Sequence, residues 1–220
     1  MNIAKILACT DHAMLKPQTC TQDIINLCTE AIEYKTACVC VPLSNVQFAK
    51  SLGGKQLIVS TVIGFPFGYS STKSKVYEAQ EAIECGASEL DMVINIGALK
   101  DANFPSVESE IKQIKKVCEN RILKVIIETC LLTNQEKIEM CKIVNNSGAE
   151  YLKTSTGFAG GGASVEDILL LKEYLDKNIK IKASGGIRSL EAAWQFLELG
   201  CERLGSSAIV NLARAAGYMP

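Results

Sequence analysis

Short apolar, strand-like segments alternate with helix-period segments along almost the whole sequence, and the turns between them are short. The strand candidates span residues 7–11, 37–41, 57–63, 89–95, 123–128, 151–155, 179–183 and 203–205. The helix candidates span residues 21–34, 44–52, 72–85, 104–119, 134–146, 164–175 and 189–199, and Gly205-Ser206-Ser207 opens one more helix. Eight strands separated by helices are typical of a (β/α)8 TIM barrel, and an open doubly wound sheet is the alternative. We predict an α/β protein with one TIM-barrel domain over residues 1–220 and a short N-terminal helix.

Residues at the ends of these segments support the assignment. Thr21, Ser164 and Ser189 are suited to cap a helix, because a side-chain oxygen there accepts a hydrogen bond from a free backbone N–H group. Gly86 and Gly148 follow helical segments, where glycine adopts the left-handed conformation that ends many helices. The helix limits are therefore predicted by local chemistry as well as by periodicity.

The composition excludes several classes of function. The chain has 220 residues, a formal net charge of −1 and 48% hydrophobic residues, as expected for a globular protein with a full core. A nearly neutral chain has no basic field to attract nucleic acid or an anionic membrane, so any anion site must be local. No segment approaches the roughly 18 continuous apolar residues of a membrane span, and the N-terminal apolar run is too short for a signal peptide. We expect a cytoplasmic protein with no nucleic-acid or membrane partner.

The ten cysteines suggest at first a disulfide framework or a metal site. They form no Cys-x-x-Cys pair, and a chain of this length does not need disulfides for stability. His12 is the only histidine, so a zinc site would need a thiolate cluster that the spacing lacks. We expect reduced, mostly buried cysteines and no metal.

Two lysines stand near the ends of strand candidates. Lys153 is followed by Thr-Ser-Thr-Gly, and Lys182 by Ala-Ser-Gly-Gly. An ammonium group removed from water, or placed beside a second ammonium, has a lowered pKa, and the neutral amine attacks carbonyl carbons. Either lysine alone is more simply read as a surface residue at a strand end. Their joint placement predicts an imine-forming enzyme.

Alternation along the strands predicts which polar side chains face the barrel interior. Asp91 lies between Leu90 and Met92, so its side chain points to the opposite side from these apolar neighbours. The same argument predicts that Lys124, Lys153 and Lys182 also point inward, where compensating charges are tolerated. Lys124 could equally be a structural ion-pair partner of Asp91 or Glu128.

Two turns are candidates for phosphate binding. Gly185-Gly186 follows the seventh strand candidate and Gly205-Ser206-Ser207 the eighth, where barrels of this kind often bind phosphate through backbone N–H groups. Arg188 could add a positive charge there, or could be a solvated residue. The glycine-rich residues 157–162 lack the pattern of a P-loop or a dinucleotide-binding loop, so we expect a lid or wide turn beside Lys153.

Five segments, in this order and spacing, resemble those of the deoxyribose-phosphate aldolase family. They are residues 89–95, 124–129, 153–157, 182–188 and 205–207. The resemblance extends from Asp11 to Ser207, nearly the whole chain. It implies a class I aldolase that needs no metal or cofactor, acts on a small phosphorylated sugar and acetaldehyde, and assembles as a homodimer or homotetramer.

The resemblance also implies individual roles. Lys153 would form the Schiff base, and Lys182 would lie close by and lower the pKa of Lys153. Asp91 would transfer protons together with a water molecule, and Asp11 and Lys124 would belong to the supporting polar network. The residues implied to hold the sugar and its phosphate are Thr156, Gly157, Gly185, Gly186, Gly205, Ser206 and Ser207.

The implied reaction is the reversible cleavage of 2-deoxy-D-ribose 5-phosphate to D-glyceraldehyde 3-phosphate and acetaldehyde, in deoxyribonucleotide breakdown. Breaking the C2–C3 bond leaves an electron pair on C2, which a protonated imine at C1 accepts as an enamine. A base removes the C3 hydroxyl proton, and a proton then returns to the enamine carbon. Asp91 could carry these protons if burial raises its pKa towards neutrality.

The sequence departs from the family pattern at several positions. Ala13 stands where a threonine is usual, which removes one hydroxyl, and Pro42 alters the turn after the second strand candidate. Cys40 is read as a buried structural thiol, with an inhibitory adduct as the alternative. A tail that carries Tyr218 to the phosphate is a further open possibility. Other readings of the whole chain are an aldolase or transaldolase for another phosphosugar, a barrel without catalysis, and a metal or redox protein.

Overall fold

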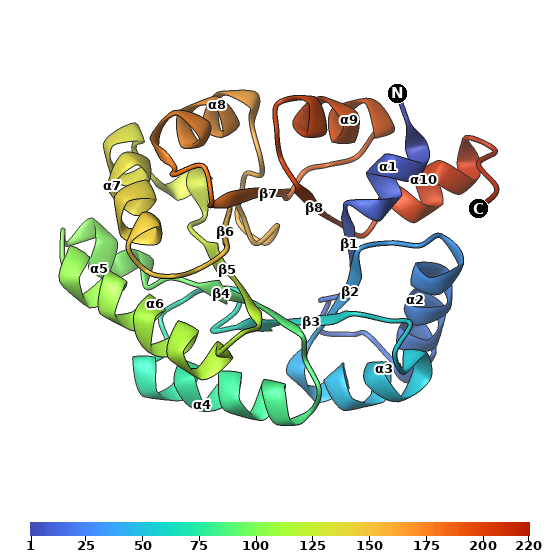
Figure 1. Cartoon of the computed structure of the whole chain (residues 1–220), viewed down its shortest axis with the longest axis horizontal. Helices are drawn as coiled ribbons and strands as arrows, with labels where there is room; N and C mark the ends of the chain where they lie inside the picture. Colours follow the sequence, from blue (N-terminus) through green and yellow to red (C-terminus); the bar gives the residue numbers. More distant parts are fainter.

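Eight parallel strands form a closed barrel in the order β1 to β8, and the computed structural model describes all residues from Met1 to Pro220. Figure 1 looks into the ring of strands, with the helices arranged around its outside. The strands are β1 (Thr10–Ala13), β2 (Cys38–Val41), β3 (Val59–Ile63), β4 (Glu89–Val93), β5 (Ile122–Ile126), β6 (Tyr151–Lys153), β7 (Lys180–Ser184) and β8 (Arg203–Ser206). The predicted (β/α)8 barrel is therefore confirmed.

Ten α-helices and two short 3-10 helices connect and surround the strands. The α-helices are α1 (Ile3–Ala8), α2 (Thr21–Glu33), α3 (Val46–Gly53), α4 (Thr72–Glu84), α5 (Ile96–Lys100), α6 (Phe104–Cys118), α7 (Asn134–Asn145), α8 (Val165–Tyr174), α9 (Leu190–Glu198) and α10 (Ile209–Ala215). The 3-10 helices are η1 (Leu43–Asn45) and η2 (Thr129–Leu131). Ser164 and Ser189 cap α8 and α9 as predicted, through hydrogen bonds from backbone N–H groups of the first turn.

The predictions were wrong in detail at the first strand. Residues 7–11 were expected to be extended, but the strand begins at Thr10, because Ile6 and Leu7 belong to α1 and bury their side chains there. A short apolar run fits a buried helix as well as a strand, and α1 supplies the predicted N-terminal helix. Thr21 is the first residue of α2, and Cys20 takes the N-cap position in its place.

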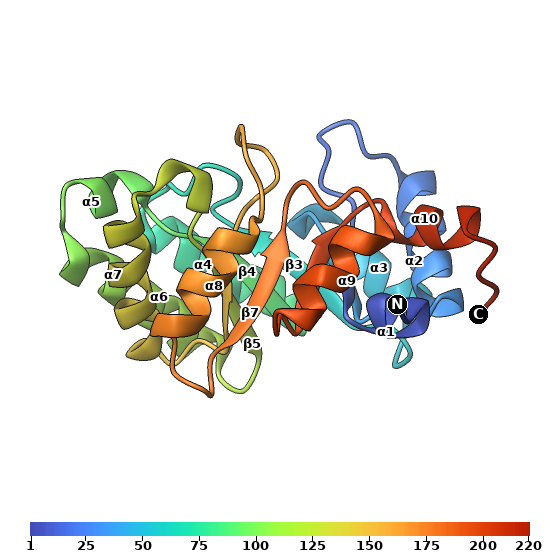
Figure 2. The same cartoon turned by 90° about the horizontal axis from the view of Figure 1, so that it is seen from above.

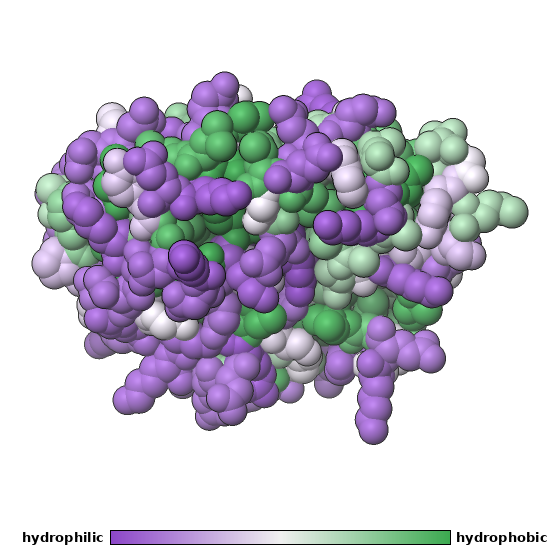
Figure 3. All heavy atoms as spheres, turned by 45° about the horizontal axis from the view of Figure 1, so that its top comes forward, coloured by the Kyte–Doolittle hydropathy of each residue, from purple (hydrophilic) through white to green (hydrophobic).

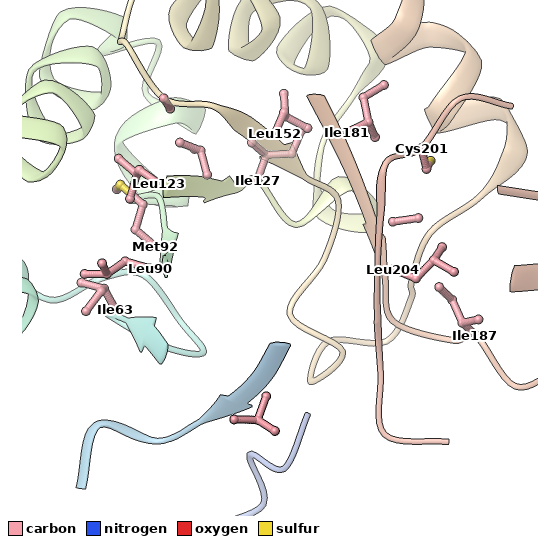
Figure 4. Packing of buried hydrophobic residues seen from close by; sticks show 14 of the residues in the cluster. Ile63, Leu90, Met92, Leu123, Ile127, Leu152, Ile181, Ile187, Cys201 and Leu204 are labelled. Atoms are coloured by element: carbon pink, nitrogen blue, oxygen red, sulfur yellow. The ribbon is translucent and has the colours of Figure 1, made fainter. Parts of the chain in front are cut away.

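The hydrophobic core lies between the strands and the helices. One cluster of 50 buried apolar residues includes Leu90, Met92 and Leu123. Figure 4 shows these residues with Ile63 in the layer between the strands and the surrounding helices. Burial of such a side chain contributes roughly 1.5–3 kcal/mol. Because the side chains alternate, the residues between these apolar positions point to the barrel interior.

Loops from the carboxyl ends of the strands gather on one side of the barrel. Figure 2 shows the blue loop after β1 and the golden loop after β6 rising on the same side of the molecule. The outer face seen in Figure 3 is largely hydrophilic, with smaller apolar areas between the charged side chains. No helix combines the length and apolar character that crossing a membrane requires. All ten cysteines are free, and six of them are buried.

Candidate active site

A cavity of about 570 Å³ opens at the carboxyl ends of the strands, where barrel enzymes place their active sites. Nine of the twelve predicted site residues line it. They are Lys153, Lys182, Thr156, Gly157, Gly185, Gly186, Gly205, Ser206 and Ser207. The other three predicted residues, Asp11, Asp91 and Lys124, are fully buried and lie beneath the cavity in contact with its lysines or with one another.

Lys153 and Lys182 lie side by side at the floor of the cavity. They are register partners on the neighbouring strands β6 and β7, so their side chains point to the same face. The Nζ atom of each lysine contacts Oδ2 of Asp91, at 2.8 Å for Lys153 and 2.7 Å for Lys182. One carboxylate oxygen on β4 therefore joins both lysines.

Beneath these lysines a layer of ion pairs fills the barrel. Lys124 Nζ lies 2.8 Å from Asp91 Oδ1 and 2.6 Å from Glu89 Oε2. Arg203 pairs with Glu89 at 2.7 Å and with Asp11, which also accepts a hydrogen bond from Lys182. Together the members form one connected set, which we call the interior charge network. It comprises Asp11, Glu89, Asp91, Lys124, Lys153, Lys182 and Arg203.

The charges of this network identify Lys153 as the unusual member. Three carboxylates stand against four cationic side chains, so three of the cations are balanced and one is in excess. Lys124, Lys182 and Arg203 each contact two or more carboxylates, whereas Lys153 contacts Asp91 alone. A buried network is most stable when its charges cancel. Loss of a proton from Lys153 would give that balance.

The pKa shifts agree with this count. Burial lowers the pKa of Lys153 below its ordinary value; Asp91 acts against burial, and the charge of Lys182 adds to it. Burial would also lower the pKa of Lys182, but Asp11 and Asp91 outweigh it and raise that pKa. The two neighbouring lysines thus differ, since one is shifted towards the free amine and the other remains an ammonium group. The charge of Lys182 acts on the pKa of Lys153 in the same direction as burial, and burial is the larger cause.

The expectation that burial brings the pKa of Asp91 towards neutrality is wrong. Burial does act in that direction, but the positive charges of Lys124, Lys153 and Lys182 hold the pKa of this carboxyl well below its usual range. Asp91 is therefore ionised at neutral pH in the free protein. It can accept a proton, and it holds none to donate in this state.

The rim of the cavity is built from backbone rather than from side chains. We use the term rim for residues 185–188 and 205–208. Gly185 and Gly186 have φ angles of 79° and 74°, which favour glycine. The backbone N–H groups of Gly186, Ile187 and Arg188, and that of Ser207, donate no hydrogen bond within the protein. All four residues line the cavity, and free backbone N–H groups gathered at a concave site are suited to bind an anion.

The glycine-rich segment after Lys153 is a wide turn packed against the rim. Ala163 N–H donates to the carbonyl oxygens of Ser184 and Gly185. A Cβ atom on Gly162 would lie 2.3 Å from the Gly185 oxygen, so only glycine allows this close approach. The segment therefore belongs to the wall of the cavity.

Several single-residue predictions have definite outcomes. Ala13 lines the cavity and offers no hydroxyl there. Cys40 also lines it, and burial raises the pKa of its thiol, which favours the inert structural reading. Tyr218 packs against the hydrophobic core and is absent from the cavity lining. Glu128 is not a partner of Lys124, because its carboxylate instead accepts hydrogen bonds from Thr156.

Sequence reasoning missed three charged residues at the site. Glu89 and Arg203 belong to the interior charge network, and Lys16 lines the cavity. Glu89 shares the strand parity of Asp91, which could have identified it. Arg203 begins a strand and Lys16 lies in a loop, and neither has a local signal that separates it from a solvated surface residue.

One group of side chains has the composition of a metal site. Asp11, Cys38 and Glu89 place ligand atoms within 4.8 Å of one another. Both carboxylates are already paired with lysine or arginine, and burial raises the pKa of the Cys38 thiol well above its ordinary value. A metal ion would have to displace these cations and a thiol proton, so the donor set does not suit one.

A closed barrel with ion-paired lysines at the floor of a cavity, at the carboxyl ends of its strands, is the arrangement of a (β/α)8-barrel enzyme. The model of the DeoC/LacD family of aldolases matches residues 5–201. The chain belongs to this family and is an aldolase, a carbon–carbon lyase.

Named relatives cover almost the entire chain. It is 48% identical over 214 residues to the deoxyribose-phosphate aldolase of Clostridium botulinum (strain Eklund 17B / Type B), covering 97% of each chain. It is 49% identical over 209 residues to that of Clostridioides difficile (strain 630), covering 95% of each chain.

Solved structures give the same result. A putative deoxyribose-phosphate aldolase from Coccidioides immitis superposes with a TM-score of 0.94 at 40% identity, covering 99% of this chain and 88% of the other. The deoxyribose phosphate aldolase from Aeropyrum pernix, described as tetrameric, has a TM-score of 0.91 at 27% identity. The match covers 98% of this chain and 92% of the other. Orotidine 5'-phosphate decarboxylase from Pyrococcus horikoshii OT3, at 13% identity and a TM-score of 0.66, shares the fold.

Proposed function

We propose that the protein catalyses the reversible cleavage of 2-deoxy-D-ribose 5-phosphate to D-glyceraldehyde 3-phosphate and acetaldehyde, through a Schiff base on Lys153. The observation that carries this proposal is the pair of buried lysines that share Asp91 Oδ2 at the floor of one cavity. Their pKa values are shifted in opposite directions, which agrees with different roles. The named relatives support the choice of substrate.

Lys153 is the nucleophile because it is the lysine that can lose its proton. Its neutral amine attacks C1 of the open-chain sugar, and loss of water gives a protonated imine. The C2–C3 electron pair then moves into the imine to form an enamine, while the C3 hydroxyl loses its proton and becomes the aldehyde of glyceraldehyde 3-phosphate. A proton on the enamine carbon and hydrolysis of the imine release acetaldehyde and restore the amine.

Asp91 and Lys182 have complementary roles in these steps. The Asp91 carboxylate lies 2.8 Å from Lys153 Nζ, so it stabilises the positive imine that replaces the neutral amine. As an ionised group it can also accept a proton, with a water molecule bridging to the substrate. Lys182 stays charged because Asp11 and Asp91 hold its proton, and it therefore does not compete as a nucleophile.

The rim would hold the phosphate group. Four unpartnered N–H groups, from Gly186, Ile187, Arg188 and Ser207, offer hydrogen bonds, and the side chains of Arg188 and Lys16 line the same cavity. A cavity of about 570 Å³ is within the usual range for small-molecule sites. Remote phosphate binding would position C1 against Lys153.

The setting of this activity is also a proposal. We infer one domain over residues 1–220, a cytoplasmic location and a homodimeric or homotetrameric assembly. The ten free cysteines fit a reducing compartment, and one relative is described as a tetramer. Light scattering on the purified protein tests the assembly.

Borohydride trapping tests the chemistry. The protein is incubated with acetaldehyde or with 2-deoxyribose 5-phosphate, reduced, and mapped by peptide mass analysis. We expect a two-carbon adduct on Lys153 only, and acetaldehyde release from the sugar phosphate. Lys153→Met should remove the adduct, whereas Lys180→Met, at the exposed start of β7, should not. An adduct on Lys182, or cleavage without acetaldehyde, would overturn the assignment.

A further inference from the structure

Glu128 is a buried acid outside the interior charge network. It directly follows Ile127 after β5, is 2% exposed, and has a φ angle of 53°, in the left-handed region. This conformation costs free energy in any residue with a side chain, so it persists only where the surroundings impose it. Backbone hydrogen bonds on either side of Glu128, from Ile127 to Lys153 and from Thr129 to Thr154, fix it against the strand that carries the nucleophile.

The Glu128 carboxylate has no cationic partner. Its oxygens accept hydrogen bonds from the Thr156 N–H group, at 3.2 and 3.3 Å, and from the Thr156 hydroxyl. The only other polar contact is the Cys130 thiol at 4.0 Å. A buried carboxylate is costly unless it is strongly hydrogen-bonded. In this protein its strong hydrogen bonds come from one residue of the loop after β6.

Thr156 belongs to the wall of the cavity. Thr156, Gly157 and Phe158 all line it, and Phe158 N–H donates to the Thr156 hydroxyl oxygen at 3.0 Å. The Phe158 ring packs edge-on against Phe65, with ring centres 5.2 Å apart. Since both donor groups of Thr156 are engaged by Glu128, Thr156 has none left for a substrate.

The 156–158 wall connects Lys153, at one end of the site, with the rim, at the other end. Thr156 is three residues from Lys153, and the next residue, Gly157, packs against Gly185 of the rim. A shift of this loop would alter the distance between the nucleophile and the phosphate site. It would leave the ion pairs around Lys153 in place.

We propose that Glu128 is a positioning residue that holds the 156–158 wall and so sets the spacing between Lys153 and the rim. This inference rests on the proposed function, because the spacing matters only for a substrate that engages both ends. A sugar phosphate does so. Acetaldehyde contacts only the lysine end, and its imine formation does not depend on the wall.

Glu128→Gln tests this with the fold preserved. We expect kcat/KM for 2-deoxyribose 5-phosphate to fall about 10- to 100-fold, because small misplacements at a reacting centre have effects of that order. The rate of borohydride trapping of acetaldehyde on Lys153 should change less than about threefold, and the preference for 2-deoxyribose 5-phosphate over unphosphorylated 2-deoxyribose should shrink. Thr156→Val removes the hydroxyl and keeps the shape of the side chain. It should likewise lower kcat/KM for cleavage while leaving the rate of acetaldehyde trapping nearly unchanged.

Glu110→Gln is the matched control. Glu110 is also a buried carboxylate that connects elements, through Lys75 and the Asn95 N–H group, but neither it nor these two partners line the cavity. It should lower thermal stability without changing the ratio of the two rates. An equal loss of cleavage and trapping in Glu128→Gln and Thr156→Val, or no loss in either, would overturn the inference. The proposed function fails separately, if the unaltered protein neither traps on Lys153 nor releases acetaldehyde.

Discussion

The floor and the rim of the cavity are built on opposite principles. The floor is the interior charge network, in which each ammonium and carboxylate is held by side chains from other strands. The rim is backbone, with glycines of positive φ and N–H groups that have no partner in the protein. The charged groups of the floor have partners in the free protein, whereas the free N–H groups of the rim can find hydrogen-bond acceptors only in a ligand or in water.

In the proposed function, the floor carries the chemistry and the rim carries the recognition of phosphate. Because the members of the floor share partners, the removal of one shifts the charge state of the others, and effects there should be large and not additive. The rim donors act on the ligand independently, so their loss should weaken binding in smaller, additive steps. Substitutions at the floor should therefore have larger effects than substitutions at the rim.

Asp91→Asn should have the largest effect. The substitution leaves three buried lysines without their shared carboxylate, so we expect the cleavage rate to fall about 10²- to 10⁴-fold and the free energy of unfolding to fall by roughly 3–5 kcal/mol. Steady-state kinetics and denaturant unfolding measure the two losses. Glu202→Gln, which breaks the half-exposed pair with Lys180, is the control and should change stability by at most about 1 kcal/mol.

The loss of stability should also depend on pH. The lysines depress the pKa of Asp91 in the folded protein, so its stabilisation is complete above the unfolded pKa of about 3.9 and disappears as pH falls towards the folded value. The difference in unfolding free energy between the two proteins should therefore shrink below about pH 4. A difference that grows in acid would contradict the ionised state of Asp91.

Lys182→Met should change the pH dependence of imine formation. The charge of Lys182 lowers the pKa of Lys153, and Lys182 also occupies part of the Asp91 carboxylate. Both losses raise the pKa of Lys153, so trapping of acetaldehyde should require more alkaline pH, and a pKa higher by about one would lower the rate at neutral pH about tenfold. Lys182→Arg should restore most of the rate if charge is responsible. Faster trapping at acidic pH would show that Lys182 does not act as a neighbouring charge.

Much of the floor could be predicted from the sequence because alternation is a local rule. Asp91, Lys124, Lys153 and Lys182 lie in regular strands, where parity alone fixes the side of the sheet. Alternation does not extend to Glu128, because its left-handed backbone interrupts the pattern and its carboxylate accepts a hydrogen bond from Thr156. No pattern in the sequence indicates a left-handed backbone in a residue other than glycine.

The rest depended on contacts that are distant in the sequence. Arg203 meets Glu89 across the barrel, and nothing near Arg203 in the chain distinguishes it from a solvated arginine at a strand start. The wrong pKa prediction for Asp91 has the same origin. Burial of Asp91 could be predicted from its apolar neighbours in the sequence. The contacts of three lysines with this one carboxylate depend on how the strands close into a barrel.

Arg188→Met and Lys16→Met should have the smallest effects. Both side chains line the cavity and neither forms an ion pair in the protein, so each should add only its own attraction to the phosphate. We expect KM for 2-deoxyribose 5-phosphate to rise about 5- to 20-fold in each variant, with kcat changed less than about threefold and no change for unphosphorylated 2-deoxyribose. Lys73→Met, on the exposed side of α4, is the control and should change neither.

The double variant is the sharper test of the comparison between floor and rim. If the two groups act independently on the phosphate, their KM ratios should multiply within a factor of about two. A double variant no worse than either single variant would mean that Arg188 and Lys16 depend on each other, as the charges of the floor do. In that case these two side chains would form a second coupled set, and independent action would no longer distinguish the phosphate site from the floor.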